Sequence, residues 1–431
     1  MPTGSKKYFY ISPVFLTSVY FLIVIVFFFF GGVFKFFSAS YVADNLIYYR
    51  EHFAVPAAKG LLPYKDVMIE YPPLSAVYLW LLFPFAGSQN AYNGAFICGM
   101  TAISISVLLD VFRLTDISSP MIPEKTRRLR TLAGFTFLTI AAGPIALVSL
   151  DYIAVALVTK AFLKQAEGKN FSALGLIAAA FCAKGYPILL APVFIFQALK
   201  TGGAYQFKKA IAGLFSFLFI LFGLPLILAP GGIFYSFSFH FERGVEKLSI
   251  YGAALNTAGL LHLIKLPYKP AFPGWDAGAN YYTDFAMHIS PWFLSLLLFV
   301  AFLCVLGHYS RNNVSSSTTK DTLVSVSVLS ATLVISSFML GFKVASPQFL
   351  IWLIPTSVVI YTKARVYRIA VLILAGIGFS AQWLFPWHIL SLMQGLDANV
   401  IEVLVFKNLL LFIFFMFTLV FTMKVRFSRD Q

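Results

Sequence analysis

Apolar runs long enough to cross a membrane recur throughout this chain of 431 residues. The first covers residues 11–34, and a helix needs about 20 apolar residues to cross the hydrocarbon core of a bilayer. Over the whole chain, 59% of the residues are hydrophobic and 11% are charged, whereas soluble domains average about 45–50% and about 25%. An ordinary soluble enzyme is therefore excluded, and we expect a single integral membrane domain over residues 1–431.

The later apolar runs predict the architecture. They cover residues 74–87, 91–113, 131–149, 151–163, 171–199, 210–229, 291–309, 322–341, 349–361, 367–386 and 402–423. Pro and Gly interrupt several of them, and such breaks are tolerated at membrane depth only where protein or water meets the freed backbone groups. We expect an all-α polytopic transmembrane helical bundle with about 10–13 membrane helices and juxtamembrane helices on its outer face.

Short basic clusters separate the apolar runs and set the expected orientation. By the positive-inside rule they face the cytoplasm, so the net charge of +15 marks membrane flanks and not a nucleic-acid partner. Both termini are then cytoplasmic, and residues 35–73 and 230–290 form loops on the outer face of a plasma membrane. The clusters are Lys125 with Arg127, Arg128 and Arg130; Lys200 with Lys208 and Lys209; Lys363 with Arg365 and Arg368; and Lys424 with Arg426 and Arg429.

Two points of this topology have open alternatives. The run 74–87 is short and ends in Phe-Pro-Phe, which favours a re-entrant or juxtamembrane helix over a full span. The alternative is that the run 171–199, interrupted by Gly-Tyr-Pro at 185–187, crosses once instead of twice. The Ser-Ala-Ser sequence at 38–40 resembles a signal-peptide cleavage site, but signal peptides have apolar cores of only about 7–15 residues.

The first outer loop, residues 35–73, holds the richest group of ionisable side chains. Asp44 follows the first span closely enough to meet a lipid-borne headgroup, and a carboxylate there can accept the proton of an attacking hydroxyl as a general base. The alternative role for Asp44 is the N-cap of a helix over 44–53. Surface ion pairs of Asp66 and Glu70 with Lys65 and Arg50 are the simpler explanation for these residues. The other candidates in the loop are Tyr49, Arg50, Lys65, Asp66 and Glu70.

Further polar clusters are expected on the same outer face. A carboxylate at the start of the 151–163 run is either functional or half of a buried ion pair. Outward-facing cations run against the positive-inside trend and suggest a phosphate site, because Arg offers a bidentate fork and Lys a point charge. Contact with anionic lipid heads, or pairing with Glu242 and Glu246, is the alternative. The candidates are Asp151, Lys184, His240, Arg243, Lys343 and Gln348.

No cofactor motif accompanies these clusters. The six His residues are scattered and form no HExxH pattern, and a zinc site needs three or four ligands. The phosphate-binding loop of nucleotide-dependent enzymes is absent too, so a nucleoside triphosphate is not indicated. We expect no cofactor, and nothing in the sequence indicates a divalent metal.

The polar motifs have a recognisable order. Asp44 follows the first span, then come Tyr49-Arg50, Gly60-Leu61-Leu62-Pro63-Tyr64-Lys65-Asp66 and Glu70-Tyr71-Pro72-Pro73-Leu74. Later motifs are Lys184-Gly185-Tyr186-Pro187, the stretch from Arg243-Gly244 to Leu248-Ser249, and the stretch from Lys343 to Pro355. This order resembles the GT-C glycosyltransferases that use polyprenyl-phosphate sugars, most closely the family-87 mannosyltransferase-like branch. The resemblance covers residues 1–355, and the C-terminal quarter matches only in hydropathy.

The resemblance implies an inverting membrane enzyme that moves a mannose-like hexose from a polyprenyl-phosphate donor to a lipid or glycan acceptor on the outer face. It implies that Asp44 is the general base and that Lys184, Arg243 and Lys343 hold the donor phosphate, whose developing charge must be stabilised. The loop reads Asp44-Asn45-Leu46, without the Asp-x-Asp of some eukaryotic relatives, so a divalent metal is not implied. Residues expected to bind substrate or support the site are Tyr49, Arg50, Lys65, Asp66, Glu70, Asp151, His240 and Gln348.

Two other functions fit parts of the pattern. A transporter or flippase for an anionic or lipid-linked solute would line its path with the interrupted segments near 72, 187 and 347, and it predicts charged pairs near mid-membrane. A non-catalytic scaffold of an envelope complex would not need Asp44. The gathering of polar clusters on one face favours the glycosyltransferase, with membrane lipids and its two substrates as the expected partners.

Overall fold

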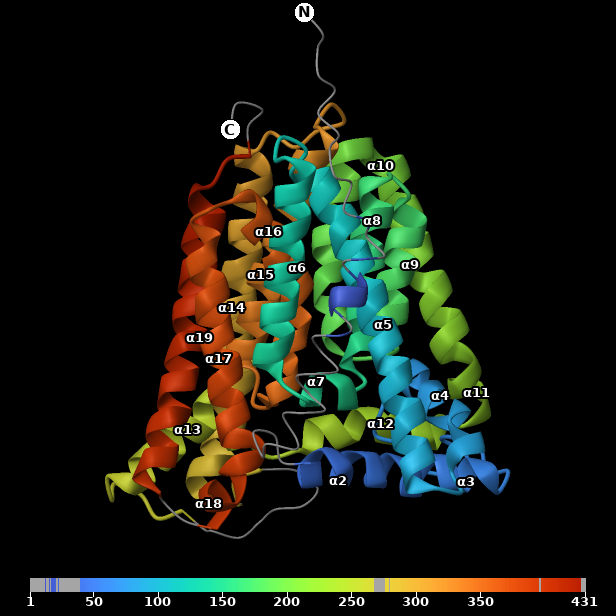
Figure 1. Cartoon of the computed structure of the whole chain (residues 1–431), viewed down its shortest axis with the longest axis vertical. Coiled ribbons are helices and arrows are strands. Elements are labelled where there is room, and N and C mark those ends of the chain that lie inside the picture. The colour runs from blue at the N-terminus through green and yellow to red at the C-terminus, as the bar shows by residue number, and fades with distance from the viewer. Residues whose placement is uncertain are drawn as a thin grey trace, which may run out of the picture.

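The computed structural model describes residues 12, 15, 17–20, 22, 39–266, 276–278, 280–394 and 397–427. The predicted first span, residues 11–34, and the start of the cleavage-like sequence after it lie mostly outside this part of the chain. Within it, every regular element is a helix, which confirms the all-α prediction (Figure 1). Six of the described stretches are long and apolar enough to cross a membrane. The chain is therefore a multi-pass transmembrane bundle.

The long helices run side by side along one axis in Figure 1. The six span candidates are α5 (Gln89–Ser118), Tyr186–Leu228, α14 (Tyr281–Arg311), α15 (Lys320–Gly341), Tyr367–Trp387 and α19 (Ala398–Lys424). The second of these contains α10 (Ala191–Leu218) and α11 (Leu224–Leu228), and the fifth begins with α17 (Tyr367–Gln382). Shorter helices complete the bundle, namely α6 (Glu124–Ala142), α8 (Asp151–Ala166), α9 (Asn170–Phe181) and α16 (Ile354–Lys363).

Helix α15 is the most enclosed of the spans. In its most apolar part 89% of the residues are buried, compared with 22% for α14. Small residues let membrane helices approach closely, and the hydroxyls of Thr332, Ser336 and Ser337 donate to carbonyls of their own helix. Their polar groups are thereby satisfied away from water. On α14, by contrast, Trp292 is 77% exposed and faces the surroundings of the bundle.

The run 171–199 passes through the bundle twice, as predicted. Inside α10, Gly202 and Gly203 depart from helical geometry, and Gly203 has a left-handed φ of 59°, so the chain reverses there. Residues 206–222 then run parallel to α9, since the side chain of Asn170 donates to Gln206 at 3.1 Å and the rings of Phe181 and Phe222 are 5.5 Å apart. The intervening segment 186–201 is the return pass.

Helix α4 (Pro73–Leu81) has only 9 residues and is followed by a 3-10 turn at Phe83–Phe85. At 1.5 Å per residue such a helix extends about 14 Å, which is about half of the hydrocarbon core. The result agrees with the prediction that 74–87 is a re-entrant or juxtamembrane segment.

Short helices gather at one end of the bundle, drawn at the bottom of Figure 1. Two of them, α2 and α12, lie across the bundle axis, and the basic connections near 119–130, 200–209 and 363–368 lie at the opposite end. The predicted separation of basic and mixed-charge ends is thus present, and the membrane side of each end stays a prediction. The short helices are α2 (Ala39–Tyr49), α3 (Val55–Ala58), α4, α7 (Ile145–Val148), α12 (Pro230–Glu242), α13 (Ile250–Leu260) and α18 (Ile389–Gln394).

Close packing of α10 on α9 depends on Gly213, because a Cβ at this position would overlap the carbonyl oxygen of Phe171. We expect Gly213→Ala to lower the Tm of the detergent-solubilised protein, since overpacking costs about 1–3 kcal/mol. Gly94→Ala is the control: no atom lies near its Cβ position in α5, and Ala is the better helix former. Equal Tm values of the two variants in a thermal-shift measurement would contradict this packing.

Candidate functional site

Helix α2 carries the predicted general base at the mixed-charge end. The helix covers Ala39–Tyr49 and continues through a π-helical turn, Arg50–Ala54, into α3. Asp44 therefore lies inside the helix, and the alternative that it is the N-cap of a 44–53 helix is wrong. The residue is exposed. Because residues four apart share a helix face, Asp44 lies on the same face as Tyr48.

Glu70 is the buried carboxylate of the first loop, with 8% of the residue exposed. The hydroxyl of Tyr48 donates to Glu70 Oε1 at 2.8 Å. Burial raises the pKa of Glu70, and a hydrogen bond from its own main chain, the Tyr48 hydrogen bond and the nearby side chains of His52 and Lys184 oppose this shift. Glu70 is thus a desolvated carboxylate, and it is held by Tyr48 of α2, which lies 22 residues earlier in the chain.

Arg50 has other partners than the predicted one. Its Nε donates to the carbonyl of Ala86 at 2.8 Å, and its guanidinium pairs with Glu51. The expected surface ion pair with Glu70 is wrong, because Arg50 is directed to the end of the α4 segment while Glu70 faces Tyr48. Arg50 therefore fastens α2 to the segment that follows α4.

The loop between α3 and α4 is shaped by local hydrogen bonds. Asp66 Oδ2 accepts the main-chain N–H of Leu62 at 2.9 Å. Asp66 and Lys65, which both lie in the described part of the chain, form no ion pair, so this expected pair is wrong. Tyr64 adopts a left-handed φ of 66°, and its hydroxyl donates to the carbonyl of Tyr71 at 2.5 Å. Lys65 is exposed. Asp66 and Tyr64 thus fix the conformation of the loop that positions Glu70, the residue before Tyr71.

The turn after α9 presents Lys184 beside this loop. Two hydrogen bonds fix the turn against the start of α4: Leu74 N donates to the carbonyl of Cys182, and Ser75 Oγ donates to the carbonyl of Ala183, each at 2.7 Å. Carbonyls freed at the end of α9 are thereby satisfied by protein. The break in the apolar run thus creates a fixed position for an ammonium group.

Asp151, at the start of α8, pairs with the ammonium group of Lys184. Its Oδ2 lies 3.4 Å from Lys184 Nζ, and its Oδ1 accepts the indole N–H of Trp352 at 2.5 Å. Only 1% of Asp151 is exposed, so the alternative of a buried ion pair is confirmed. Trp352 was not among the predicted site residues, although it lies within the Lys343–Pro355 motif. The ring stacks on Tyr186 at 4.0 Å.

Arg243 and Lys343 meet at the end of α12. Arg243 Nη2 lies 3.2 Å from Asp276 Oδ1, and the N–H of Gly244 donates to Asp276 Oδ2 at 3.1 Å. Lys343 Nζ donates to the carbonyls of Phe241, at 2.8 Å, and Arg243. No motif pointed to Asp276, which lies 33 residues away in a loop of irregular sequence.

Glu246 binds the main chain and not these cations. Its carboxylate accepts the N–H of Ala345 at 2.7 Å and the hydroxyl of Ser346, and its own N–H donates to the carbonyl of Lys343. The alternative that Arg243 and Lys343 pair with Glu246 is therefore wrong. Burial raises the pKa of Glu246. Glu242, the other expected partner, is exposed.

His240 lies on the last turn of α12, close to both cation groups. Protein atoms around the ring, followed by the positive charges of Lys184 and Arg243, lower the pKa of His240 to about 4, although the residue is open to solvent. The ring also interacts with the main chain of Glu70. The His240 ring therefore reaches from the last turn of α12 to the main chain of the first loop. Gln348, in the 3-10 helix Pro347–Leu353, is half-buried.

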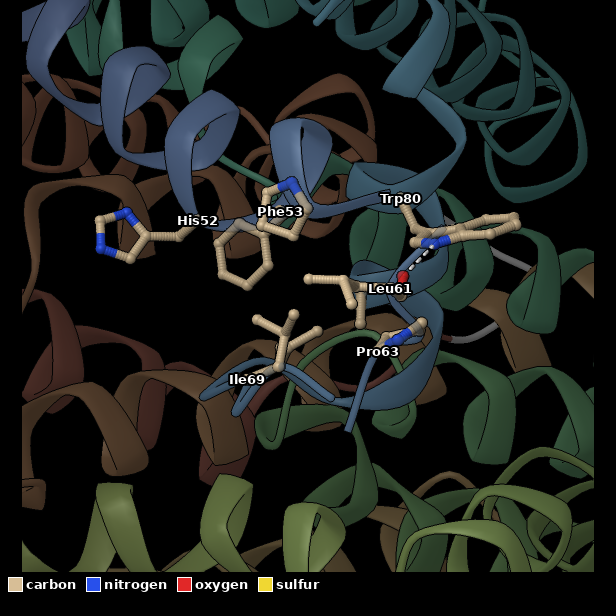
Figure 2. A pocket seen from close by; sticks show the side chains of 9 residues that line it. His52, Phe53, Leu61, Pro63, Ile69 and Trp80 are labelled. Atoms are coloured by element: carbon tan, nitrogen blue, oxygen red, sulfur yellow. Dashed lines mark hydrogen bonds between the residues drawn. The ribbon is translucent and has the colours of Figure 1, made fainter. Parts of the chain in front are cut away.

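A small apolar pocket lies next to the first loop. Figure 2 shows His52 and Phe53 on one side of it and Trp80 and Pro63 on the other, with the indole N–H of Trp80 donating to the carbonyl of Leu61 at 3.3 Å. The lining contains no carboxylate, and His52 and Ile69 place the pocket beside Glu70. It is lined by His52, Phe53, Pro56, Leu61, Pro63, Val67, Ile69, Ala76 and Trp80.

No model of a known protein family matches this chain, and no curated protein matches it. In the part of the chain that the structure describes, no three His, Cys, Asp or Glu side chains form a group that could hold a metal ion. Glu70, Lys184, His240 and Arg243 come from three segments far apart in sequence and interact electrostatically at one end of the bundle.

The Asp151 clamp has a measurable energetic consequence. We expect Asp151→Asn to destabilise the protein by about 3 kcal/mol, because it leaves a half-buried ammonium without its counter-ion. Glu167→Gln is the control, since it breaks an exposed pair with Lys164 that contributes about 0–1 kcal/mol. Denaturant titration of both variants in detergent, monitored by Trp fluorescence, measures the difference. Equal denaturation midpoints of the two variants would show that Asp151 does not stabilise the fold.

Proposed function

We propose that this chain is an integral membrane glycosyltransferase. It moves a mannose-like hexose from a polyprenyl-phosphate donor to a lipid or glycan acceptor on the outer face of the plasma membrane, with inversion and with Asp44 as general base. The observation that carries the proposal is the position of Lys184 at one end of the bundle: it is held by Asp151 at 3.4 Å and lies 5.9 Å from the ring centroid of Tyr71, the residue next to Glu70. This end is covered by helices that lie across the bundle axis (Figure 1), where a lipid-borne headgroup would arrive.

The chemistry requires few groups. The acceptor hydroxyl oxygen forms a bond to the sugar anomeric carbon, the bond from that carbon to the phosphate oxygen breaks, and the hydroxyl proton passes to Asp44. The leaving polyprenyl phosphate takes the electron pair of the broken bond. An ammonium fixed in advance at the developing negative charge stabilises the transition state, and Lys184, held by Asp151 at 3.4 Å, is oriented in this way. Asp44 is exposed and can receive an acceptor.

The transporter alternative predicts charged pairs near mid-membrane. The described bundle does contain a buried carboxylate, Asp110, which pairs with Lys160 and Arg113. Asp110 lies eight residues before the end of α5 at Ser118, and Arg113 is 68% exposed on its side chain. Long basic side chains near helix ends extend to the interface. The pair therefore supports an anchor at the basic end better than a translocation path.

The first test is transfer of radiolabelled sugar from polyprenyl-phosphate mannose, glucose and arabinofuranose into lipid or glycan acceptors. We expect membranes with wild type to transfer label from one donor, and Asp44→Asn to lower the rate at least about 100-fold, as loss of a general base does. Glu51→Gln removes an exposed carboxylate of the same helical segment and should leave transfer unchanged. Equal transfer by wild type and Asp44→Asn would remove Asp44 from the mechanism, and no transfer from any donor would favour the transporter.

The phosphate role of Lys184 has its own test. We expect Lys184→Gln to lower kcat about 100-fold, because the leaving phosphate loses a charge that stabilises it, and Lys184→Arg to retain part of the activity. Lys59→Gln removes an exposed cation at the end of α3 and should change kcat little. Wild-type kcat in a folded Lys184→Gln variant, measured with saturating donor, would exclude Lys184 from phosphate binding.

A further inference from the structure

Glu70 has no assigned role beyond general support of the site. We propose that Glu70, together with the rings of Tyr48 and Tyr71, forms a subsite that binds the hydroxyl groups of the transferred sugar. Its ligand is a hexose attached to a phosphate, and Glu70 is a specificity-determining residue that accepts hydrogen bonds from sugar hydroxyls. This inference rests on the proposed glycosyltransferase function and deepens it.

The carboxylate of Glu70 has capacity for a ligand. An ionised carboxylate can accept about four hydrogen bonds, and in the described chain one side chain, Tyr48, donates to Glu70. The same part of the chain gives Glu70 no direct ion pair, because the nearby Lys184 is bonded to Asp151. A desolvated carboxylate with too few donors is costly. Sugar hydroxyls would supply the donors at the moment of binding.

Aromatic rings surround this carboxylate. The hydroxyls of Tyr49 and Tyr71 lie 3.2 Å apart, and the Tyr49 ring packs against Phe96 with centroids 5.5 Å apart. Tyr48 and Tyr71 are half-buried, so part of each remains open, whereas Tyr49 is buried. A site with aromatic walls and a few fixed polar groups is the usual design for binding small polar molecules. Tyr49, the residue predicted from sequence, thus supports the subsite from the core, and Tyr48 and Tyr71 form its surface.

The phosphate and acceptor positions lie next to this subsite. Lys184 Nζ is 5.9 Å from the centroid of the Tyr71 ring, so a sugar over Tyr71 would place its phosphate at the ammonium and its far hydroxyls at Glu70. Asp44 lies one helical turn before Tyr48, on the same face of α2. A base, a sugar subsite and a phosphate anchor are therefore arranged around one set of side chains.

Glu70→Gln is the decisive variant, and it should fold. Because burial raises the pKa of Glu70, the folded state binds its proton more tightly than the unfolded state does, and the charged carboxylate disfavours folding at pH 7. The amide removes this charge and keeps an acceptor for Tyr48. We therefore expect the Tm of Glu70→Gln at pH 7 to equal or exceed that of wild type. Tyr48→Phe is a second, milder variant that removes the hydrogen bond alone.

The experiment uses the full chain in lipid nanodiscs, with the polyprenyl-phosphate sugar that wild type accepts and its monodeoxy analogues. Loss of a hydrogen bond to a charged group costs about 10- to 100-fold in binding. We expect Glu70→Gln to raise the donor KM by this factor with a smaller change in kcat and an unchanged pH profile. For one deoxy analogue, wild type should show the same loss, and Glu70→Gln should no longer distinguish that analogue from the parent donor. Glu51→Gln is the matched control.

Three results would overturn the inference. If Glu70→Gln behaves as Glu51→Gln does and still discriminates against every deoxy analogue, Glu70 binds no hydroxyl, and the glycosyltransferase proposal stands without it. If kcat falls with an unchanged KM and the pH profile loses its acidic limb, Glu70 is a proton acceptor and not a sugar-binding residue. If wild type transfers sugar from no donor, the subsite and the proposed function both fail, and this outcome is read from wild type alone.

Discussion

The buried carboxylate of Asp151 is the interaction on which the mixed-charge end of this protein depends. It joins the start of α8, the turn after α9 and the 3-10 helix Pro347–Leu353, because one oxygen faces Lys184 and the other accepts the N–H of Trp352. Each of these segments interrupts or begins an apolar helix, where main-chain groups need protein partners. The interruptions that leave main-chain groups without helical partners are thus also the places where the charged side chains of Asp151 and Lys184 are held.

A second buried carboxylate repeats this principle on the other side of the same end. Glu246 accepts the N–H of Ala345 and the hydroxyl of Ser346, and this connects the segment after α12 to the turn between α15 and the 3-10 helix. Asp276 then neutralises Arg243. The carboxylates hold turns in place, and Lys184 and His240 lie beside Tyr71 and Glu70 of the first loop. Rigid support of this kind is what a preorganised anion site requires.

The sequence predicted the architecture of this end better than its contacts. The short α4 and the double pass of 171–199 follow from run lengths and Gly or Pro positions, and the gathering of four polar motifs at one end follows from the positions of the basic clusters. The surface ion pairs expected for Asp66 and Glu70 do not occur, because the first loop folds under α2 and takes Glu70 to Tyr48. The N-cap alternative for Asp44 failed because the helix begins at Ala39, five residues before it.

Hydropathy is a local property, and a bilayer selects for it in runs of fixed length, so the sequence by itself determined that this chain is an all-α multi-pass bundle with one basic end. Only the tertiary structure decided which polar side chains pair with each other. Trp352 lies 201 residues from Asp151, and Asp276 lies 33 residues from Arg243. Many such pairs are compatible with the composition, and only the packing of particular helices brings two of them within hydrogen-bond distance. A buried charge is stable only with the partner that packing supplies, and this requirement links the fold to the candidate site.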